Sequence, residues 1–308
     1  MKSAKAAHST SNSSSGLFGN DFMTKLEYLS LVSRRTFRGQ LLAQRRSKKL
    51  GSGVEFADHR DYHPGDDFRH LDWNLFARHN ELLLRRFQEE EDLHVYLMLD
   101  CSKSMGFGTP SKFDLARQVT AALAYIALAD LDRASIIAFG DHVVSEFPLT
   151  RGKTRILSIL RYLEKLSPLA SETNLGQAVA GFSHGTRRSG VVVIISDLFD
   201  PRGYEKSIEL LRHHQHDVHV VHLFDRSEAE PNFLGDVELW DVENDSRRQV
   251  VIDERRLRRY REIFQKFLSD AEGYCRRYAV GYTRSTSDVP FDAMLMSMMR
   301  SAGPLSGR

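Results

Sequence analysis

Residues 93–105 read LHVYLMLDCSKSM, an apolar run that ends in alternating oxygen-bearing side chains. Apolar residues fill nearly every position from Leu93 to Leu99, which predicts a strand that is buried on both faces. The chain then turns polar at Asp100. In α/β proteins with parallel sheets, residues directly after such strands lie at the edge of the sheet where ligands bind.

The chain around this stretch alternates between predicted strands and helices. Strands are predicted over 134–139, 143–147, 191–196 and 218–224, and helices over 112–130, 153–166, 175–182 and 204–215. Continuous apolar strands joined by amphipathic helices are typical of a mostly parallel sheet with helices on both faces. We therefore predict an α/β fold in which Asp100 and Asp197, each at the end of a buried strand, share one edge of the sheet.

The flanking segments have a different composition. Residues 1–20, rich in Ser, Lys, Ala and Asn, are expected to be a flexible tail, and 21–92 a separate N-terminal segment before the α/β domain at 93–226. Residues 227–308 are expected to form a C-terminal extension packed on that domain. In this extension we predict a hairpin from 237–240 and 249–252, a helix over 254–279, a strand over 282–285 and a helix over 291–302.

The composition narrows the class of protein. A net charge of +2 on 308 residues does not favour nucleic-acid binding by the chain as a whole. The two cysteines, Cys101 and Cys275, are not spaced as a zinc motif or a disulfide framework. No signal-peptide pattern begins the chain, and its longest near-apolar run, 121–129, is too short to span a membrane. We therefore expect a cytoplasmic protein without a membrane span.

Five oxygen-bearing side chains form the candidate site, and they are Asp100, Ser102, Ser104, Thr173 and Asp197. Hard dications such as Mg²⁺ or Mn²⁺ prefer oxygen ligands. Two acids and three hydroxyls leave a dication partly uncompensated, so the ion has reason to accept a carboxylate from a partner protein. Taken singly, each residue has a structural explanation, because a serine after a strand often caps the next helix.

This set resembles the metal-ion-dependent adhesion site of von Willebrand factor A domains, which reads Asp-x-Ser-x-Ser, then a Thr, then an Asp. The resemblance covers about residues 90–226 and implies a von Willebrand factor A-like fold. It also implies that the two serines and the threonine touch the ion directly and that the acids act through water. Two positions depart from the family pattern: Leu198 where many members have Gly, and Glu172 where a small residue is common.

A second motif lies at Tyr62-His63-Pro64-Gly65-Asp66-Asp67-Phe68-Arg69 and ends at Asp72-Trp73. It resembles the signature of domain-of-unknown-function family fifty-eight, DUF58, whose members place this block before an A-like domain. Members are commonly encoded beside MoxR-type AAA+ ATPases. The resemblance therefore implies an adaptor role with such an ATPase, and a client protein's carboxylate as a further partner.

The acidic and histidine-rich block at residues 58–72 leaves two interpretations open. One is an ion-pair network around the Pro64-Gly65 turn, with Trp73 anchored in the core. The other is a second metal site, because His and Asp at short spacing ligate zinc or manganese. In that case the protein would be a metal-dependent hydrolase acting on phosphoesters or nucleic acids.

Three hypotheses for the function follow. The first is a metal-dependent protein-binding module rather than an enzyme, the second is the hydrolase, and the third is a scaffold whose metal site stays empty. ATP hydrolysis by this chain is not expected. The stretch Arg151-Gly152-Lys153-Thr154 resembles the end of a phosphate-binding loop, but the required first glycine is replaced by Phe147.

Overall fold

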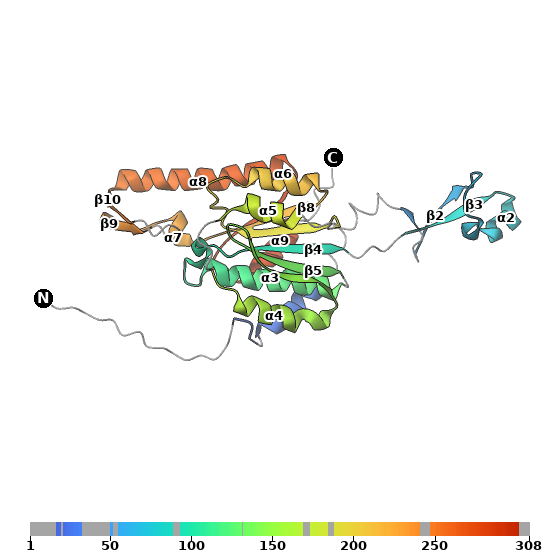
Figure 1. Ribbon diagram of the computed structural model, residues 1–308, viewed down its shortest axis with the longest axis horizontal. Helices are drawn as coiled ribbons and strands as arrows, with labels where there is room; N and C mark the ends of the chain where they lie inside the picture. The colour runs from blue at the N-terminus through green and yellow to red at the C-terminus, as the bar shows by residue number, and fades with distance from the viewer. Residues whose placement is uncertain are drawn as a thin grey trace.

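The computed structural model describes residues 17–19, 21–32, 50–51, 55–88, 93–130, 132–168, 173–183, 188–240 and 247–301. Its central feature is a six-stranded sheet covered by helices on both faces (Figure 1). From one side to the other the strands are β11 (Gly281–Thr286), β8 (Asp217–Phe224), β7 (Val191–Ser196), β4 (His94–Asp100), β5 (Arg133–Phe139) and β6 (Val143–Arg151). All neighbouring strands are parallel except β6, which runs antiparallel to β5. The predicted mostly parallel α/β fold is confirmed.

The strand register brings the ends of β4, β5 and β7 to one edge. Leu99 pairs with Ile195 of β7, and Asp100 pairs with Phe139 of β5. Every residue of β4 and β7 is buried, as the apolar runs predict. Asp100 and Asp197 therefore lie at the same carboxyl edge of the sheet, in agreement with the prediction.

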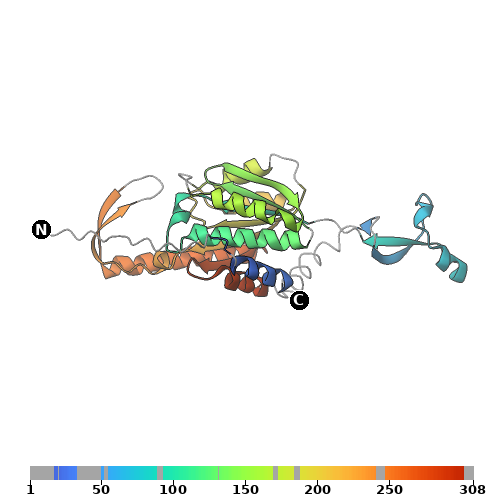
Figure 2. The same cartoon turned by 90° about the horizontal axis from the view of Figure 1, so that it is seen from below.

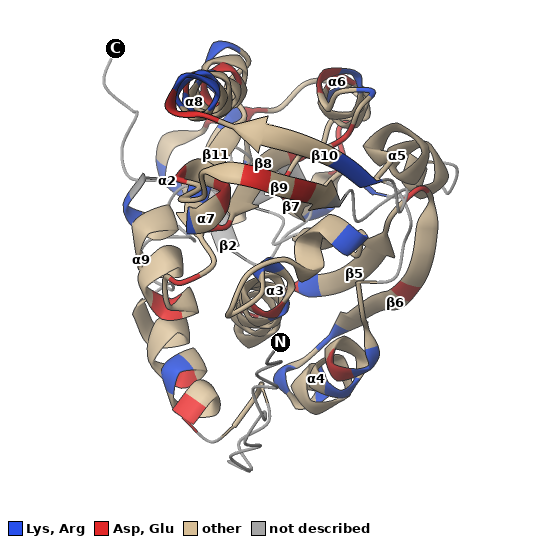
Figure 3. Cartoon of the chain, turned by 90° about the vertical axis from the view of Figure 1, so that its left-hand side faces the viewer, with Lys and Arg blue, Asp and Glu red and all other residues tan. Residues whose placement is uncertain are grey.

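The helices form one apolar layer on each face of the sheet, as seen end-on in Figure 3. One layer consists of α3 (Lys112–Ala129), α4 (Ile156–Lys165), α9 (Phe291–Ser301) and the helical residues 21–32. The other consists of α5 (Leu175–Ser183), α6 (Glu205–His213) and the second half of α8 (Glu254–Arg277). The sequence places α3, α4, α5, α6, α8 and α9 within a few residues of their observed bounds.

Helix α3 is buried far more than its sequence predicts. We expected an amphipathic helix, but α3 lies between the sheet and the helices α4 and α9, so two of its polar residues, Lys112 and Thr120, are buried as well. Thr120 satisfies its hydroxyl by donating to Ala116 O at 2.7 Å. Lys112, at the first position of the helix, has no exposed side-chain surface at all.

The C-terminal segment contributes to the sheet and also projects from it. Strand β11 pairs with β8 and forms an outer strand of the main sheet. Before it, β9 (Gly235–Trp240) and β10 (Arg247–Ile252) form the predicted hairpin, and the short helix α7 (Arg226–Ala229) precedes them. The hairpin and the first turns of α8 extend beyond the carboxyl edge (Figures 1 and 2). On α8, Leu257, Phe264 and Ala271 are buried, whereas Tyr260 and Tyr278 are exposed.

A smaller sheet carries the acidic and histidine-rich block. It consists of β1 (Leu50–Gly51), β3 (Leu83–Gln88) and β2 (Glu55–Asp61), with the one-turn helix η1 (Phe68–His70) and α2 (Trp73–His79) in the connection. Trp73, which we expected to be anchored in a core, is 59% exposed because it opens α2 on the outside of this unit. None of the helices among the described residues is long and apolar enough to cross a membrane.

Several expectations fall on residues outside the described ranges. They concern the tail before residue 17 and the residue Glu172.

Candidate metal-binding site

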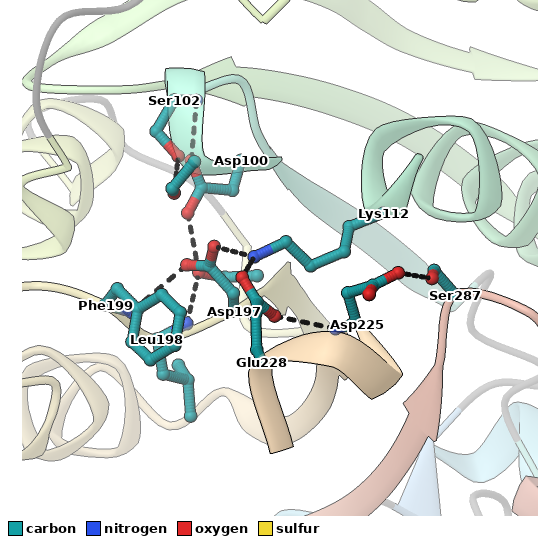
Figure 4. A network of polar contacts seen from close by, with 11 residues as sticks. Asp100, Ser102, Lys112, Asp197, Leu198, Phe199, Asp225, Glu228 and Ser287 are labelled. Carbon is teal, nitrogen blue, oxygen red and sulfur yellow. Dashed lines mark hydrogen bonds and ion pairs between the residues drawn. The ribbon is translucent and has the colours of Figure 1, made fainter. Parts of the chain in front are cut away.

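Asp100 ends strand β4 with its side chain fully buried and its two oxygens engaged on opposite sides (Figure 4). Oδ1 accepts a hydrogen bond from the backbone N–H of Ser102 at 2.9 Å, which turns the chain sharply after the strand. Oδ2 accepts from the hydroxyl of Ser196, the last residue of β7, at 2.6 Å. These two bonds fix the carboxylate between neighbouring strands.

Ser102 and Ser104 face one another directly after this turn. Their Oγ atoms lie 3.0 Å apart. Ser102 precedes the short helix η2 (Lys103–Gly106), yet its side chain makes no capping hydrogen bond. The common structural role of a serine after a strand therefore does not apply here. The two hydroxyls point at each other and supply a pair of oxygen donors beside Asp100.

Thr173 brings an unsatisfied hydroxyl to the same edge. Its side chain is buried, and Oγ1 has no hydrogen-bond partner among the described residues. The following N–H groups hold this segment at the edge: Asn174 N–H donates to Gly140 O after β5, and Leu175 N–H donates to Oδ2 of Asp200 after β7, both at 2.8 Å. A buried hydroxyl without a partner costs about 1–3 kcal/mol, so a ligand that bonds to Oγ1 of Thr173 would be stabilising.

Asp197 forms a buried ion pair that the sequence did not reveal. Its Oδ2 lies 2.8 Å from Nζ of Lys112, and both side chains are fully buried. The same ammonium lies 2.6 Å from Oε1 of Glu228 in α7. The other oxygen of Asp197 accepts from the N–H of Phe199, whose ring centre is 5.1 Å from the ammonium. Lys112 thus joins the sheet edge to α7.

Glu228 also belongs to a capping box that fixes α7. Its Oε2 accepts from the N–H of Asp225 at 2.6 Å, while Asp225 caps the first turn by accepting from Ser227 N–H. Asp225 is held in turn by the hydroxyl of Ser287, at 2.6 Å, beyond β11. Both carboxylate oxygens of Glu228 are therefore engaged, one by Lys112 and the other by the N–H of Asp225.

Burial and neighbouring charges set the protonation of the site. Burial, together with the charge of Asp197, raises the pKa of Asp100 to about 7. Burial also raises the pKa of Glu228. For Lys112 burial acts to lower the pKa, but the charges of Asp197 and Glu228 outweigh it and the pKa is raised. Near neutral pH the ammonium of Lys112 is therefore charged, and Asp100 is close to the midpoint of its titration.

The donor set fits a hard dication in type, with one qualification. Asp100, Ser102 and Asp197 converge in Figure 4, and Oγ of Ser104 lies 3.0 Å from Oγ of Ser102. Thr173 lies on the same edge without a hydrogen bond to any of them. All five offer oxygen, and the free hydroxyl of Thr173 is the feature that an ion would explain. The qualification is Lys112, whose charge already compensates Asp197, so the site is less negative than two acids suggest.

The model of the family described as "Protein of unknown function DUF58" matches residues 58–269. The chain belongs to the DUF58 family. Uncharacterized proteins of Mycobacterium tuberculosis and Mycobacterium bovis are each 28% identical over 74% of this chain and 73% of their own length. The uncharacterized protein YeaD of Bacillus subtilis is 28% identical over 34% of this chain and 24% of its length.

Two solved structures resemble this DUF58 chain weakly. The conserved hypothetical protein BatB from Bacteroides thetaiotaomicron has 15% identity and a TM-score of 0.44 over 68% of this chain and 98% of its own. An aerotolerance-related membrane protein from Bacteroides fragilis has 16% identity and a TM-score of 0.45 over the same shares. At these values the site must be judged on its own geometry.

Sequence reasoning missed Lys112, Ser196 and Glu228. Lys112 reads as an ordinary exposed residue at the start of a helix, and nothing local marks it as buried. The spacing of Asp225 and Glu228 matches a capping box, which would have identified the cap but not the contact with Lys112. Ser196 directly precedes Asp197, and its role depends on the alignment of β7 with β4.

Leu198, one of the two departures from the A-domain pattern, has a backbone conformation that suits glycine. Its φ angle is +59°, in the left-handed region. Its N–H donates to Ser196 Oγ at 2.9 Å, which keeps that hydroxyl aimed at Asp100. The leucine side chain is buried in the apolar layer around α5 and α6. Burial of this side chain offsets the backbone strain.

The acidic block of the DUF58 signature forms turns and caps. Asp72 caps α2 and lies 3.1 Å from Nε2 of His59, while Asp66 pairs with Arg60 at 2.7 Å. Asp67 caps η1 through the N–H of Arg69. Within the described ranges no cluster of three or more His, Cys, Asp or Glu residues is arranged to hold a metal. These contacts are those of the ion-pair network, the first of the two interpretations.

Proposed function

We propose that this DUF58 protein is a divalent-cation-dependent protein-binding module built on a von Willebrand factor A-like domain. The observation that carries the proposal is the buried Thr173 hydroxyl, which has no partner among the described residues and lies on the same sheet edge as the Asp100–Ser102–Ser104 cluster. Buried polar groups are almost always satisfied, so an orphan among oxygen donors points to an ion.

Each residue has a distinct part in this proposal. Ser102, Ser104 and Thr173 would hold Mg²⁺ or Mn²⁺, and Asp100 and Asp197 would supply negative charge. A bound dication accepts a carboxylate from the partner, which is the chemistry that the ion supplies. The N–H of Ser102 and the hydroxyl of Ser196 orient Asp100, and Lys112 holds Asp197 in place. Because the pKa of Asp100 is about 7, cation binding releases a proton and strengthens as pH rises.

The partner that we propose is a MoxR-type AAA+ ATPase, with this protein acting as its adaptor in the assembly or maturation of a complex. This part rests on the resemblance of the block at residues 62–73 and the A-like site that follows it. The hydrolase gains no support from geometry, because His59, Asp66 and Asp72 are engaged in caps and ion pairs of the small sheet.

The test is Mn²⁺ titration by calorimetry, together with capture of a MoxR-type ATPase from the same organism with and without chelator. The double variant Ser102→Ala/Ser104→Ala is expected to lose both cation binding and cation-dependent capture. Ser135→Ala, at a buried serine near the start of β5 and four residues before its carboxyl end at Phe139, is the matched control and should retain both. Capture that survives in chelator, or Mn²⁺ binding that survives in the double variant, would contradict the proposal.

A further inference from the structure

Exposed apolar side chains gather where the β9–β10 hairpin meets the start of α8. Tyr260 and Ile263 are three residues apart on α8 and lie on one face of it. Arg256, four residues before Tyr260, shares that face and donates to the carbonyl of Val251 in β10. Ile263 is 55% exposed and Val251 58%. We call Val251, Arg256, Arg259, Tyr260 and Ile263 the hairpin–helix surface.

The charge around the hairpin–helix surface favours an acidic occupant. Residues 247–263 contain seven arginines against three acids, Asp253, Glu254 and Glu262, and Nη1 of Arg259 lies 3.4 Å from Oε2 of Glu262. Asp253 accepts from the N–H of Arg256 as the cap of α8, so its charge is partly used within the chain. Such a concentration of positive charge attracts and orients an acidic partner.

The exposed apolar residues of the surface favour an acidic protein over a nucleic acid as the partner. Val251 and Ile263 are aliphatic and more than half exposed, and a phosphate backbone offers no apolar groups to cover them. A protein segment that alternates acidic and apolar side chains satisfies both kinds of residue at once. Apolar contacts then supply affinity and charge supplies orientation.

Direct contacts connect the hairpin–helix surface to the candidate ion site. Phe199, two residues after Asp197, packs on Phe267 and Phe264 of α8 with ring centres 5.5 and 6.4 Å apart. Phe264 in turn stacks on Tyr260 at 6.1 Å. On the other side, α7 holds Glu228 against Lys112 and leads directly into the hairpin. The surface and the site are therefore fixed relative to one another on the carboxyl side of the sheet (Figure 3).

We propose that the hairpin–helix surface binds an acidic, apolar segment of the partner protein, and that a carboxylate of the same partner completes the ion at the sheet edge. The ion contact rests on the proposed function above. The surface itself is tested separately, because its residues lie outside the ion-binding set.

The experiment measures fluorescence anisotropy of a short labelled peptide in which Glu alternates with Leu and Phe, added to the full chain with Mg²⁺. A peptide with Gln for every Glu and a single-stranded oligonucleotide serve as comparison probes. Ile263→Asp is expected to weaken binding of the Glu peptide about tenfold, because it removes an apolar contact and repels carboxylates. Leu157→Asp, at a residue of α4 that is 58% exposed, is the matched control and should change nothing.

The contribution of the arginines is tested with a control variant on the same helix. Arg259→Glu should weaken binding several-fold, whereas Arg277→Glu at the far end of α8 should not. Three outcomes would overturn the proposal: equal peptide binding by Ile263→Asp and Leu157→Asp, tighter binding of the oligonucleotide than of the Glu peptide, or a dimer of this chain that Ile263→Asp dissociates.

Failure of the ion site is recognised separately. If Mg²⁺ does not raise the melting temperature of the wild type, but peptide binding depends on Ile263, the surface stands and the ion-dependent function fails. If Mg²⁺ instead stabilises the wild type and not Ser102→Ala/Ser104→Ala, while Ile263→Asp leaves peptide binding unchanged, only the proposal for the hairpin–helix surface is overturned.

Discussion

The ammonium of Lys112 lies 2.8 Å from Oδ2 of Asp197, and neither side chain has any exposed surface. A second carboxylate, from Glu228, lies 2.6 Å from the same nitrogen. One buried cation thus serves two acids from different parts of the chain. Since isolated charges are costly inside a protein, removing the shared partner affects both acids at once.

Lys112→Met is therefore expected to destabilise the fold by about 3–5 kcal/mol, the usual cost of leaving buried charges without their partner. Urea unfolding at neutral pH measures the loss. Lys103→Met, a partly exposed lysine of the neighbouring η2, is the control and should change stability by less than about 0.5 kcal/mol. Glu228→Gln in the Lys112→Met background should recover part of the loss, and no recovery would show that Glu228 does not depend on Lys112.

Asp100 predicts a pH dependence with a definite sign. Its pKa is about 7 in the folded protein, raised from an ordinary value of 3.8 by burial and by the charge of Asp197. The folded state holds the proton more tightly, so the contribution is fully present below pH 4 and is lost as pH rises to about 7. Unfolding free energies measured from pH 4 to 8 should therefore fall for the wild type relative to Asp100→Asn. A constant difference across that range would contradict the raised pKa.

Mg²⁺ should reduce this loss above pH 7, because the cation compensates the charge that Asp100 acquires. The same pH series, repeated with Mg²⁺, measures the reduction. Asp100→Asn should show little response to the ion.

The effect of Thr173→Val on stability is expected to differ in sign with and without the ion. Without a dication it removes a buried hydroxyl that has no partner in the described part of the chain, so stability should stay equal or rise by up to about 1 kcal/mol. With Mg²⁺ the variant should lack the stabilisation that the wild type gains. Thr120→Val is the matched control, because its hydroxyl is bonded to Ala116 O; it should lose about 1 kcal/mol in both conditions. Melting curves with Mg²⁺ and with chelator separate these patterns.

Leu198→Gly sets two effects against each other. Glycine relieves a positive φ angle, worth about 1–2 kcal/mol, but it removes a buried leucine side chain, worth about 1.5–3 kcal/mol or more. We expect net destabilisation of about 1–2 kcal/mol in urea unfolding. Ala279→Gly, at an exposed residue with φ of +52°, has no such burial to lose and should be neutral or stabilising. If Leu198→Gly were stabilising, the strain at this position would exceed the value of the buried side chain.

Local patterns in the sequence were sufficient for the strands and helices of the main sheet. The apolar run that ends at Asp100 and the run that ends at Ser196 became fully buried neighbouring strands, because such runs fit only the middle of a covered sheet. This placed Asp100 and Asp197 on one edge, as predicted. The spacing of apolar residues also located α4, whose inward residues Ile156, Ile159, Leu160 and Leu163 are all buried.

The contacts that complete the site depend on distant parts of the chain and left no local pattern. Lys112 meets Glu228 across 116 positions, and Asp100 meets Ser196 across 96. The exposure of Trp73 was mispredicted for a related reason: a large aromatic residue is usually buried, but here it opens a short helix on a small sheet with little core to enter. The burial of a residue depends on the segments that surround it in space, and the adjacent residues in the sequence do not specify those segments.

The position of β11 limits how the chain can be shortened. This strand reaches β8 only after the hairpin and the 24 residues of α8, about 36 Å of helix. A fragment that stops at residue 226 would leave the backbone N–H and C=O groups along one side of β8 unpaired and its apolar neighbours uncovered. Exposed strands of this kind recruit other strands, so such a fragment is expected to aggregate, whereas one that continues through α9 keeps the outermost row of hydrogen bonds closed.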